Sequence, residues 1–213
     1  MNFLIKNELI DGVGPWYWLN NPGDMTFEFI KRDWVNYHSK VIDRLFPDGG
    51  HTVIQAGGNC GMYPRLLSEK FELVYTFEPS NDLFPFVAMN TAGRNIVKMQ
   101  AALAECTGKF IGTVDAYQDN CGMTTVTPVD CNCIPVFTID SFEFNKVDLI
   151  FLDTEGCELA ILMGSLDTMA RCSPKLILEL HVSFVENVSA FLAQYGYSLT
   201  EHIGPHDYLY EKV

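Results

Sequence analysis

Apolar residues recur along most of the chain in short runs, and segments with a helical period separate them. Five runs predict strands: HTVIQAG (51–57), ELVYTFEP (72–79), NIVKMQAAL (95–103), VDLIFLD (147–153) and KLILELH (175–181). The last two are nearly continuous in apolar residues, as strands covered on both faces must be. The segments between them predict helices: YPRLLSEKF (63–71), NDLFPFVAMNTAG (81–93) and CELAILMGSLDTMA (157–170). This alternation of strands and helices predicts an α/β fold with a mostly parallel sheet.

Three regions depart from the alternation. Residues 1–50 hold the aromatic stretch Trp16–Trp18 and then an amphipathic helix at 25–46, so they predict an N-terminal helical cap. The segment 108–137 alternates Thr, Val and Ile with turn residues and predicts an inserted β-ribbon over the ligand edge of the sheet. The C-terminal segment 197–212 predicts an antiparallel hairpin. We therefore expect a single domain, 1–213, built on a Rossmann-like doubly wound sheet.

The composition of the chain limits the kinds of molecule that the protein is expected to bind. The 213 residues carry a formal net charge of −13, and no cluster of Lys and Arg appears, so neither nucleic acid nor an anionic membrane is expected as a partner. No apolar run approaches the roughly 20 residues of a membrane helix, and the first ten residues are too interrupted for a signal peptide. We expect a cytoplasmic protein with reduced thiols, in which Cys131 and Cys133 lack the second pair that a zinc site needs.

Two features indicate a nucleoside-like ligand. The loop Gly57–Gly61 follows the first predicted strand and leads into a helix, where free N–H groups suit a carboxylate or phosphate. Glu78 ends the second strand about 20 residues downstream, where an acid accepts hydrogen bonds from ribose hydroxyls. Pro64 or a neighbour replaces the third glycine of the dinucleotide fingerprint, so the loop fits a carboxylate better than a pyrophosphate. A nucleotide-dependent oxidoreductase or nucleotide-sugar enzyme remains an alternative.

These segments resemble the FkbM branch of class I S-adenosylmethionine-dependent methyltransferases. V-I-Q-A-G-G-N-C-G-M-Y resembles the first motif of that branch, which usually has an acid and then G-A-N-x-G, and T-F-E-P-S-N-D-L resembles the second. T-I-D-S-F, followed by V-D-L-I-F-L-D-T-E-G-C-E-L-A-I-L-M-G-S, resembles its hallmark block, and I-L-E-L-H resembles the strand after it. The resemblance covers Val53 to about His181.

The resemblance implies S-adenosylmethionine as cofactor and gives a role to several positions. Those that would bind it are Gly57, Asn59 and Gly61 (methionyl part), Glu78 with Pro79 (ribose), Ala101 and Ala102 (adenine) and Asp153 (methionyl amino group). Gln55 stands where the family usually has Asp or Glu, which helps to fix the cofactor's ammonium group. Because a hydrogen bond to a charged group is worth about 1.5–3 kcal/mol against about 1 for a neutral one, we expect weaker binding or compensation by Asp153.

The chemistry implied by the resemblance is the transfer of an activated methyl group, which needs orientation and, for a hydroxyl acceptor, a general base. Glu155 and His181 are the candidate catalytic residues, although a role in holding the site is an equal alternative, and Glu158 fits helix capping. No metal is expected, since no spacing compels a site at Asp153, Glu179 and His181. We expect O-methylation of a small-molecule or carbohydrate hydroxyl. The alternative from another class is a catalytically silent binding module, and the oligomeric state stays open.

Overall fold

The computed structural model describes residues 3–6, 16–19, 34–108, 110–115, 124–128 and 134–213 of the chain. Cys131, Cys133 and residues 25–33 of the predicted N-terminal helix lie outside these ranges. No helix in the described ranges is long and apolar enough to cross a membrane.

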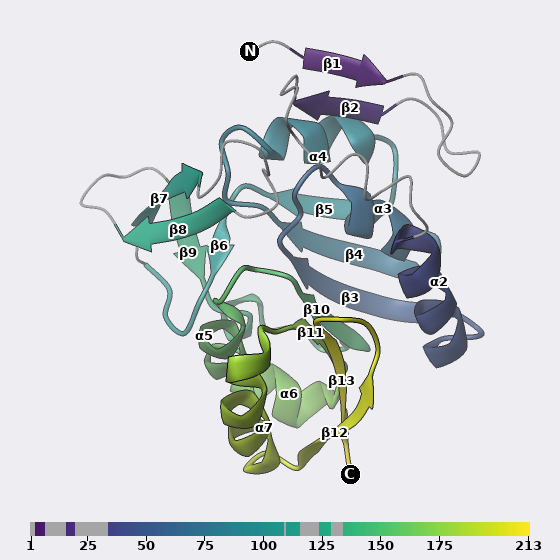
Figure 1. Cartoon of the computed structure of the whole chain (residues 1–213), viewed down its shortest axis with the longest axis vertical. Coiled ribbons are helices and arrows are strands. Elements are labelled where there is room, and N and C mark those ends of the chain that lie inside the picture. The colour runs from purple at the N-terminus through teal and green to yellow at the C-terminus, as the bar shows by residue number, and fades with distance from the viewer. Residues whose placement is uncertain (1–2, 7–15, 20–33, 109, 116–123, 129–133) are drawn as a thin grey trace.

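The centre of the fold is a seven-stranded sheet with the strand order β12-β13-β11-β10-β3-β4-β5 (Figure 1). Its strands are β3 (Gly50–Ala56), β4 (Phe71–Phe77), β5 (Ile96–Met99), β10 (Leu149–Leu152), β11 (Lys175–Glu179), β12 (Tyr197–His202) and β13 (Asp207–Lys212). All pairs from β11 to β5 are parallel, whereas β13 is antiparallel to both of its neighbours. The predicted doubly wound sheet with an antiparallel C-terminal hairpin is therefore confirmed, and the last strand of the chain lies inside the sheet.

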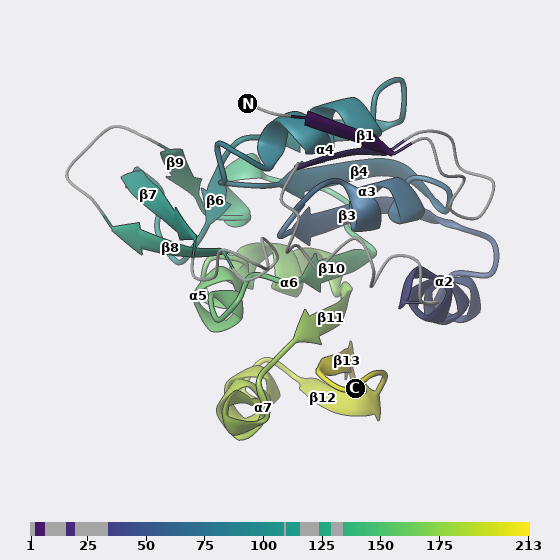
Figure 2. The same cartoon turned by 45° about the horizontal axis from the view of Figure 1, so that its top comes forward.

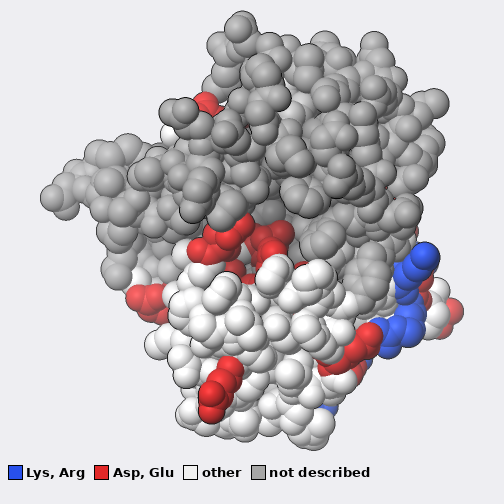
Figure 3. Space-filling model, in the orientation of Figure 1, with Lys and Arg blue, Asp and Glu red and all other residues white. Residues whose placement is uncertain are grey.

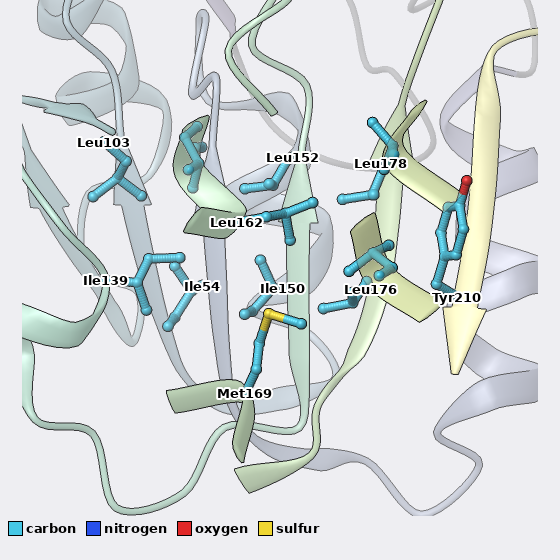
Figure 4. Packing of buried hydrophobic residues seen from close by; sticks show 14 of the residues in the cluster. Ile54, Leu103, Ile139, Ile150, Leu152, Leu162, Met169, Leu176, Leu178 and Tyr210 are labelled. Atoms are coloured by element: carbon cyan, nitrogen blue, oxygen red, sulfur yellow. The ribbon is translucent and has the colours of Figure 1, made fainter. Parts of the chain in front are cut away.

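Helices cover both faces of this sheet. One apolar cluster joins α2 (Trp34–Leu45) and α3 (Met62–Leu67) to side chains such as Val53, Phe151 and Ile177. The opposite cluster joins α5 (Glu158–Met163), α6 (Leu166–Cys172) and α7 (Val185–Ala193) to the alternate residues of the same strands. Figure 4 shows this second layer, with Leu162 and Met169 packed over Ile150 and Leu176. Successive strand residues point to opposite faces, which explains why both faces require apolar residues.

The predicted β-ribbon is present as part of a second, four-stranded sheet with the order β6-β9-β7-β8. Its strands are β6 (Ala102–Leu103), β7 (Phe110–Asp115), β8 (Thr124–Pro128) and β9 (Ile134–Phe137). The sheet lies beyond the end of the main sheet toward which β3 and β4 point (Figures 1 and 2). The third predicted strand, 95–103, is divided between the two sheets, because the chain bends at Gln100 and residues 102–103 pair with β9.

Part of the N-terminal region forms strands, which the sequence analysis did not predict. β1 (Phe3–Lys6) pairs with β2 (Trp16–Leu19) in an antiparallel two-stranded sheet. Asn90, at the end of α4 (Phe84–Asn90), holds β2 in place: its Oδ1 accepts a bond from Tyr17 N (2.8 Å), and its Nδ2 donates to Tyr17 O (2.9 Å). The aromatic stretch is thereby attached to the helix that follows β4.

Candidate active site

The candidate site lies where the parallel strands β3, β4 and β10 end. Gly57 N and Gly58 N both donate to Phe77 O (3.0 Å each), and Asp153 N donates to Ala56 O (3.1 Å). These bonds hold the loops after the three strands against one another. Figure 3 shows several acidic side chains gathered near the centre of the face drawn there. Ligands of open α/β sheets bind at this edge.

The glycine loop contains several residues in the left-handed backbone conformation. Gly57 and Gly61 have φ angles of +82° and +92°, and Asn59 between them has +48°. A Cβ atom at Gly57 would lie 1.7 Å from the carbonyl oxygen of Asp153, so no other residue fits there without moving the loop. The helix that follows, α3, has only six residues, so the loop relies more on its own N–H groups than on a long helix dipole.

Glu78 connects the glycine loop to the end of β4. Its carboxylate accepts bonds from Asn59 N (Oε2, 2.6 Å) and from Ser80 N (Oε1, 2.8 Å), and the residue is only 5% exposed. Burial raises the pKa of Glu78 to about 7, while the two backbone N–H bonds act in the opposite direction. Pro79 continues the chain into this turn. Each carboxylate oxygen keeps a second lone pair with which to accept a ligand's hydroxyl.

Gln55 makes contacts that the sequence analysis did not anticipate. Its side chain is fully buried, and Nε2 donates to Ala56 O (3.0 Å) and to Gly57 O (2.9 Å). Its Oε1 accepts a bond from the hydroxyl of Thr76 on β4. Every polar atom of this side chain therefore has a partner inside the protein, and the amide supports the start of the glycine loop.

Carboxyl groups crowd the ends of β10 and β11. Burial raises the pKa of Asp153 well above its ordinary value, and a hydrogen bond with the Glu179 carboxyl raises it further. Glu155 is exposed, with a φ of +54°. Partial burial and then the charges of Glu179 and Glu158 raise the pKa of Glu155 to about 7. Burial and neighbouring negative charge both disfavour the ionised form, so Asp153 and Glu155 hold their protons more readily than free carboxyl groups do.

The remaining predicted residues occupy several different positions. Glu158 is buried and accepts bonds from Thr154 N (3.0 Å) and the Thr154 hydroxyl (2.8 Å), so it organises the turn after β10. His181 follows β11 and is exposed; its Nδ1 lies 2.7 Å from Ser183 Oγ, which orients the ring. Ala101 is buried in the larger apolar cluster, and Ala102 packs against β9 in the small sheet.

The sequence analysis missed two side-chain contacts. Asn90 also donates to Cys60 O (2.7 Å), so α4 holds the glycine loop from outside. His38 of α2 has Nε2 at 3.3 Å from Oδ1 of Asp207 at the start of β13. Within the described ranges, no three His, Cys, Asp or Glu side chains converge as metal ligands would, and the alternative of a metal at Asp153, Glu179 and His181 gains no support there.

The strand order, the glycine loop after β3 and the buried acid after β4 define a Rossmann-like domain of the methyltransferase type. Residues 60–199 match the model of the methyltransferase FkbM domain, and the chain belongs to this family. No curated protein sequence matches the chain.

Three solved structures share the fold. Methyltransferase FkbM from Methylobacillus flagellatus KT is 18% identical with a TM-score of 0.56, over 86% of this chain and 52% of that one. Precorrin-8w decarboxylase from Methanobacterium thermoautotrophicum is 13% identical with a TM-score of 0.52, over 83% and 89%. A Streptococcus mutans protein in complex with S-adenosylhomocysteine (SAH) is 12% identical with a TM-score of 0.50, over 84% and 97%. The chain thus spans about half the length of the FkbM structure.

Proposed function

We propose that the chain binds S-adenosylmethionine and transfers its methyl group to a hydroxyl of a small-molecule or carbohydrate acceptor. The observation that carries this proposal is the bond from Asn59 N to Glu78 Oε2, because it joins the glycine loop and the ribose-binding acid into one preformed unit. Membership of the FkbM family supports the reaction class. The net charge of −13 favours a small acceptor over nucleic acid.

The residues at this edge fit such a cofactor. Asn59 Oδ1 is buried and has no hydrogen-bond partner among the described residues, so the loop offers an acceptor to a ligand's donor. Glu78 offers two oxygens for the ribose hydroxyls, and Gly57 brings the backbone close to Asp153. When bound, S-adenosylmethionine supplies a methyl group that its sulfonium already activates. The part of the protein is therefore to hold and orient the reactants.

Two residues are candidates for the general base that accepts the proton of the acceptor's hydroxyl. Glu155 is exposed at the end of β10, and its pKa of about 7 suits proton transfer near neutral pH. His181 is exposed after β11, with its ring oriented by Ser183. Either group removes the proton only when the hydroxyl lies within hydrogen-bond reach of it.

Mass spectrometry of acceptor pools incubated with S-adenosylmethionine tests the function. We expect one class of hydroxyl compound to gain a methyl group. If His181 is the base, His181→Ala slows transfer by about 10²–10⁴-fold and leaves cofactor affinity nearly unchanged. His51→Ala is the matched control, because His51 is part-exposed at the opposite end of β3. Normal turnover in His181→Ala assigns the proton to Glu155, which Glu155→Gln then tests. Binding of the cofactor without transfer to any acceptor would favour a silent binding module.

A further inference from the structure

The glycine loop is held by two different elements. Asn59 N donates to Oε2 of Glu78 (2.6 Å), which follows β4 and belongs to the proposed cofactor site. One residue further on, Cys60 O accepts a bond from Nδ2 of Asn90 (2.7 Å) at the end of α4. A Cβ atom at Gly61 would lie only 3.5 Å from the Cβ of Asn90, so the loop touches α4 directly. The shape of the loop therefore depends on α4 as well as on Glu78.

The peptide between Cys60 and Gly61 needs the support that α4 gives. Rotation of a peptide changes ψ of the residue before it and φ of the residue after it, and glycine accepts φ of either sign. Gly61 has a φ of +92°, and its N–H donates to Gly58 O (2.7 Å), which closes the turn around Asn59. If the peptide rotates, this bond is lost and the turn opens. The bond from Asn90 to Cys60 O opposes that rotation.

The amide of Asn90 is oriented in turn by β2, which lies along α4 (Figure 1). Asn90 is 5% exposed, its Oδ1 accepts a bond from Tyr17 N (2.8 Å), and one proton of Nδ2 goes to Tyr17 O (2.9 Å). The other Nδ2 proton goes to Cys60 O. Without β2, the buried amide would lose the two bonds that fix its direction. The backbone of Tyr17 thus determines whether Nδ2 points at the glycine loop.

Apolar packing joins the same elements. Trp18 of β2, Cys60 of the loop and Phe86 of α4 form one buried cluster, and each of them is at most 2% exposed. Arg65 lies on α3, the helix that follows the loop, and its guanidinium carbon is 4.6 Å from the centre of the Trp16 ring, which is a cation–π contact. Because β2 packs against both the loop and the helix after it, the arrangement of β2 and that of the loop are coupled.

We propose that Asn90 is a positioning residue through which β2 strengthens the binding of S-adenosylmethionine at the glycine loop. This inference rests on the proposed function, in which the loop holds the cofactor. Packed β2 orients Asn90, Asn90 fixes the Cys60 carbonyl, and the closed turn presents Asn59 to the ligand. Coupling between two sites is reciprocal, so a bound ligand also favours packed β2. The N-terminal strands therefore control the affinity for the cofactor.

Titration calorimetry with SAH tests the role of Asn90. We expect Asn90→Leu to weaken the binding of SAH roughly tenfold, because the Cys60 carbonyl loses its donor. Asn95→Leu is the matched control, since Asn95 Nδ2 also donates to two backbone carbonyls, Phe71 O (2.6 Å) and Glu72 O (3.0 Å), but at the opposite end of β4. The affinity of this control for SAH should stay close to that of the wild-type chain.

Changes in β2 itself test the coupling from the other side. The N–H and C=O of Tyr17 both point at Asn90, so Tyr17→Pro removes the donor to Asn90 without removing a bond between β1 and β2. It should weaken SAH more than Tyr17→Ala does, because the alanine variant retains the N–H. In the double variant Tyr17→Pro/Asn90→Leu the two losses should not add, since both act through one amide. Additive losses would assign the two residues to separate structural roles and overturn the proposal.

Hydrogen exchange measures the reciprocal effect in the wild-type chain. Saturating SAH should slow the exchange of the Tyr17 N–H several-fold, whereas the Val213 N–H, which donates to Gly196 O beside the edge strand β12, should change little. Equal slowing of both amides, or of neither, contradicts the coupling. An Asn90→Leu variant with wild-type affinity for SAH overturns the proposal and leaves the proposed function standing. A wild-type chain that does not bind SAH overturns both.

Discussion

Replacing Gln55 by glutamate tests how the glycine loop is supported. The family usually has an acid at this position, so the resemblance alone predicts that Gln55→Glu tightens cofactor binding if the side chain faces the ammonium group. The structure predicts the opposite, because the two N–H groups of the Gln55 amide donate to Ala56 O and Gly57 O. A carboxylate has no donor and would place a negative charge against two carbonyl oxygens in a fully buried position.

The magnitude follows from the lost bonds. Ala56 O keeps the bond from Asp153 N, so the bond that it loses is worth about 0.5–1.5 kcal/mol, whereas Gly57 O loses the one partner that it has among the described residues, at about 1–3 kcal/mol. Together these losses should lower the free energy of unfolding by about 2–4 kcal/mol. Protonation of the new carboxyl restores one donor, so its pKa in the folded state should lie above the value of about 4.3 in the unfolded chain. The folded variant then binds more protons than the unfolded one. Its stability relative to wild type therefore falls as the pH rises, by up to about 1.4 kcal/mol per pH unit.

Urea unfolding at about pH 5.5 and about pH 8 measures this difference, together with titration of SAH. The matched control is Gln194→Glu, because Gln194 is exposed at the end of α7, and its unfolding free energy should change by no more than about 0.5 kcal/mol. A Gln55→Glu variant that is as stable as wild type at the higher pH, or that binds SAH more tightly, would refute the reasoning.

Three further outcomes follow from the contacts. Gly57→Ala should lower the free energy of unfolding, measured in urea, by about 3 kcal/mol or more. The control Gly93→Ala has a φ of +73° and open space around it, so it should lose only the cost of a left-handed backbone, about 1–2 kcal/mol. Equal losses in the two variants would contradict the close contact between Gly57 and Asp153. The affinity for SAH should rise from about pH 6 to about pH 8, because the Glu78 carboxyl has a pKa of about 7 and loses its proton over this range. Glu78→Ala should lower the affinity roughly tenfold or more and remove most of its pH dependence. An unchanged affinity would show that Glu78 does not belong to the site. Ile150→Ala, fully buried in β10, should cost about 2–5 kcal/mol in thermal or urea unfolding, and a loss below about 1 kcal/mol would show that this core collapses readily.

The central strands were predictable because their chemistry is local. A strand covered by helices on both faces needs apolar side chains on both, and VDLIFLD and KLILELH show this directly. The glycine loop was predictable for the same reason, since positive φ angles at Gly57 and Gly61 require glycine. The sequence of a segment predicts its structure when the interactions that determine this structure lie within the segment itself.

Features that depend on distant partners were not predictable in this way. β2 is held by Asn90, 73 residues away from Tyr17, so the aromatic stretch alone gave no sign of a strand. The role of Gln55 depends on Thr76, 21 residues further on. Glu179 and Asp207 are neighbours only because β13 lies between β11 and β12, and no local pattern determines that strand order.

Equilibrium titration of the wild-type chain with SAH tests the central claim most directly, with NADH as the comparison ligand. The account predicts that SAH binds at one site per chain, that NADH does not bind, and that Glu78→Ala weakens SAH. Binding of NADH in preference to SAH, or no binding of SAH at any pH between about 6 and 8, would contradict the assignment of the glycine loop and Glu78 to an S-adenosyl ligand.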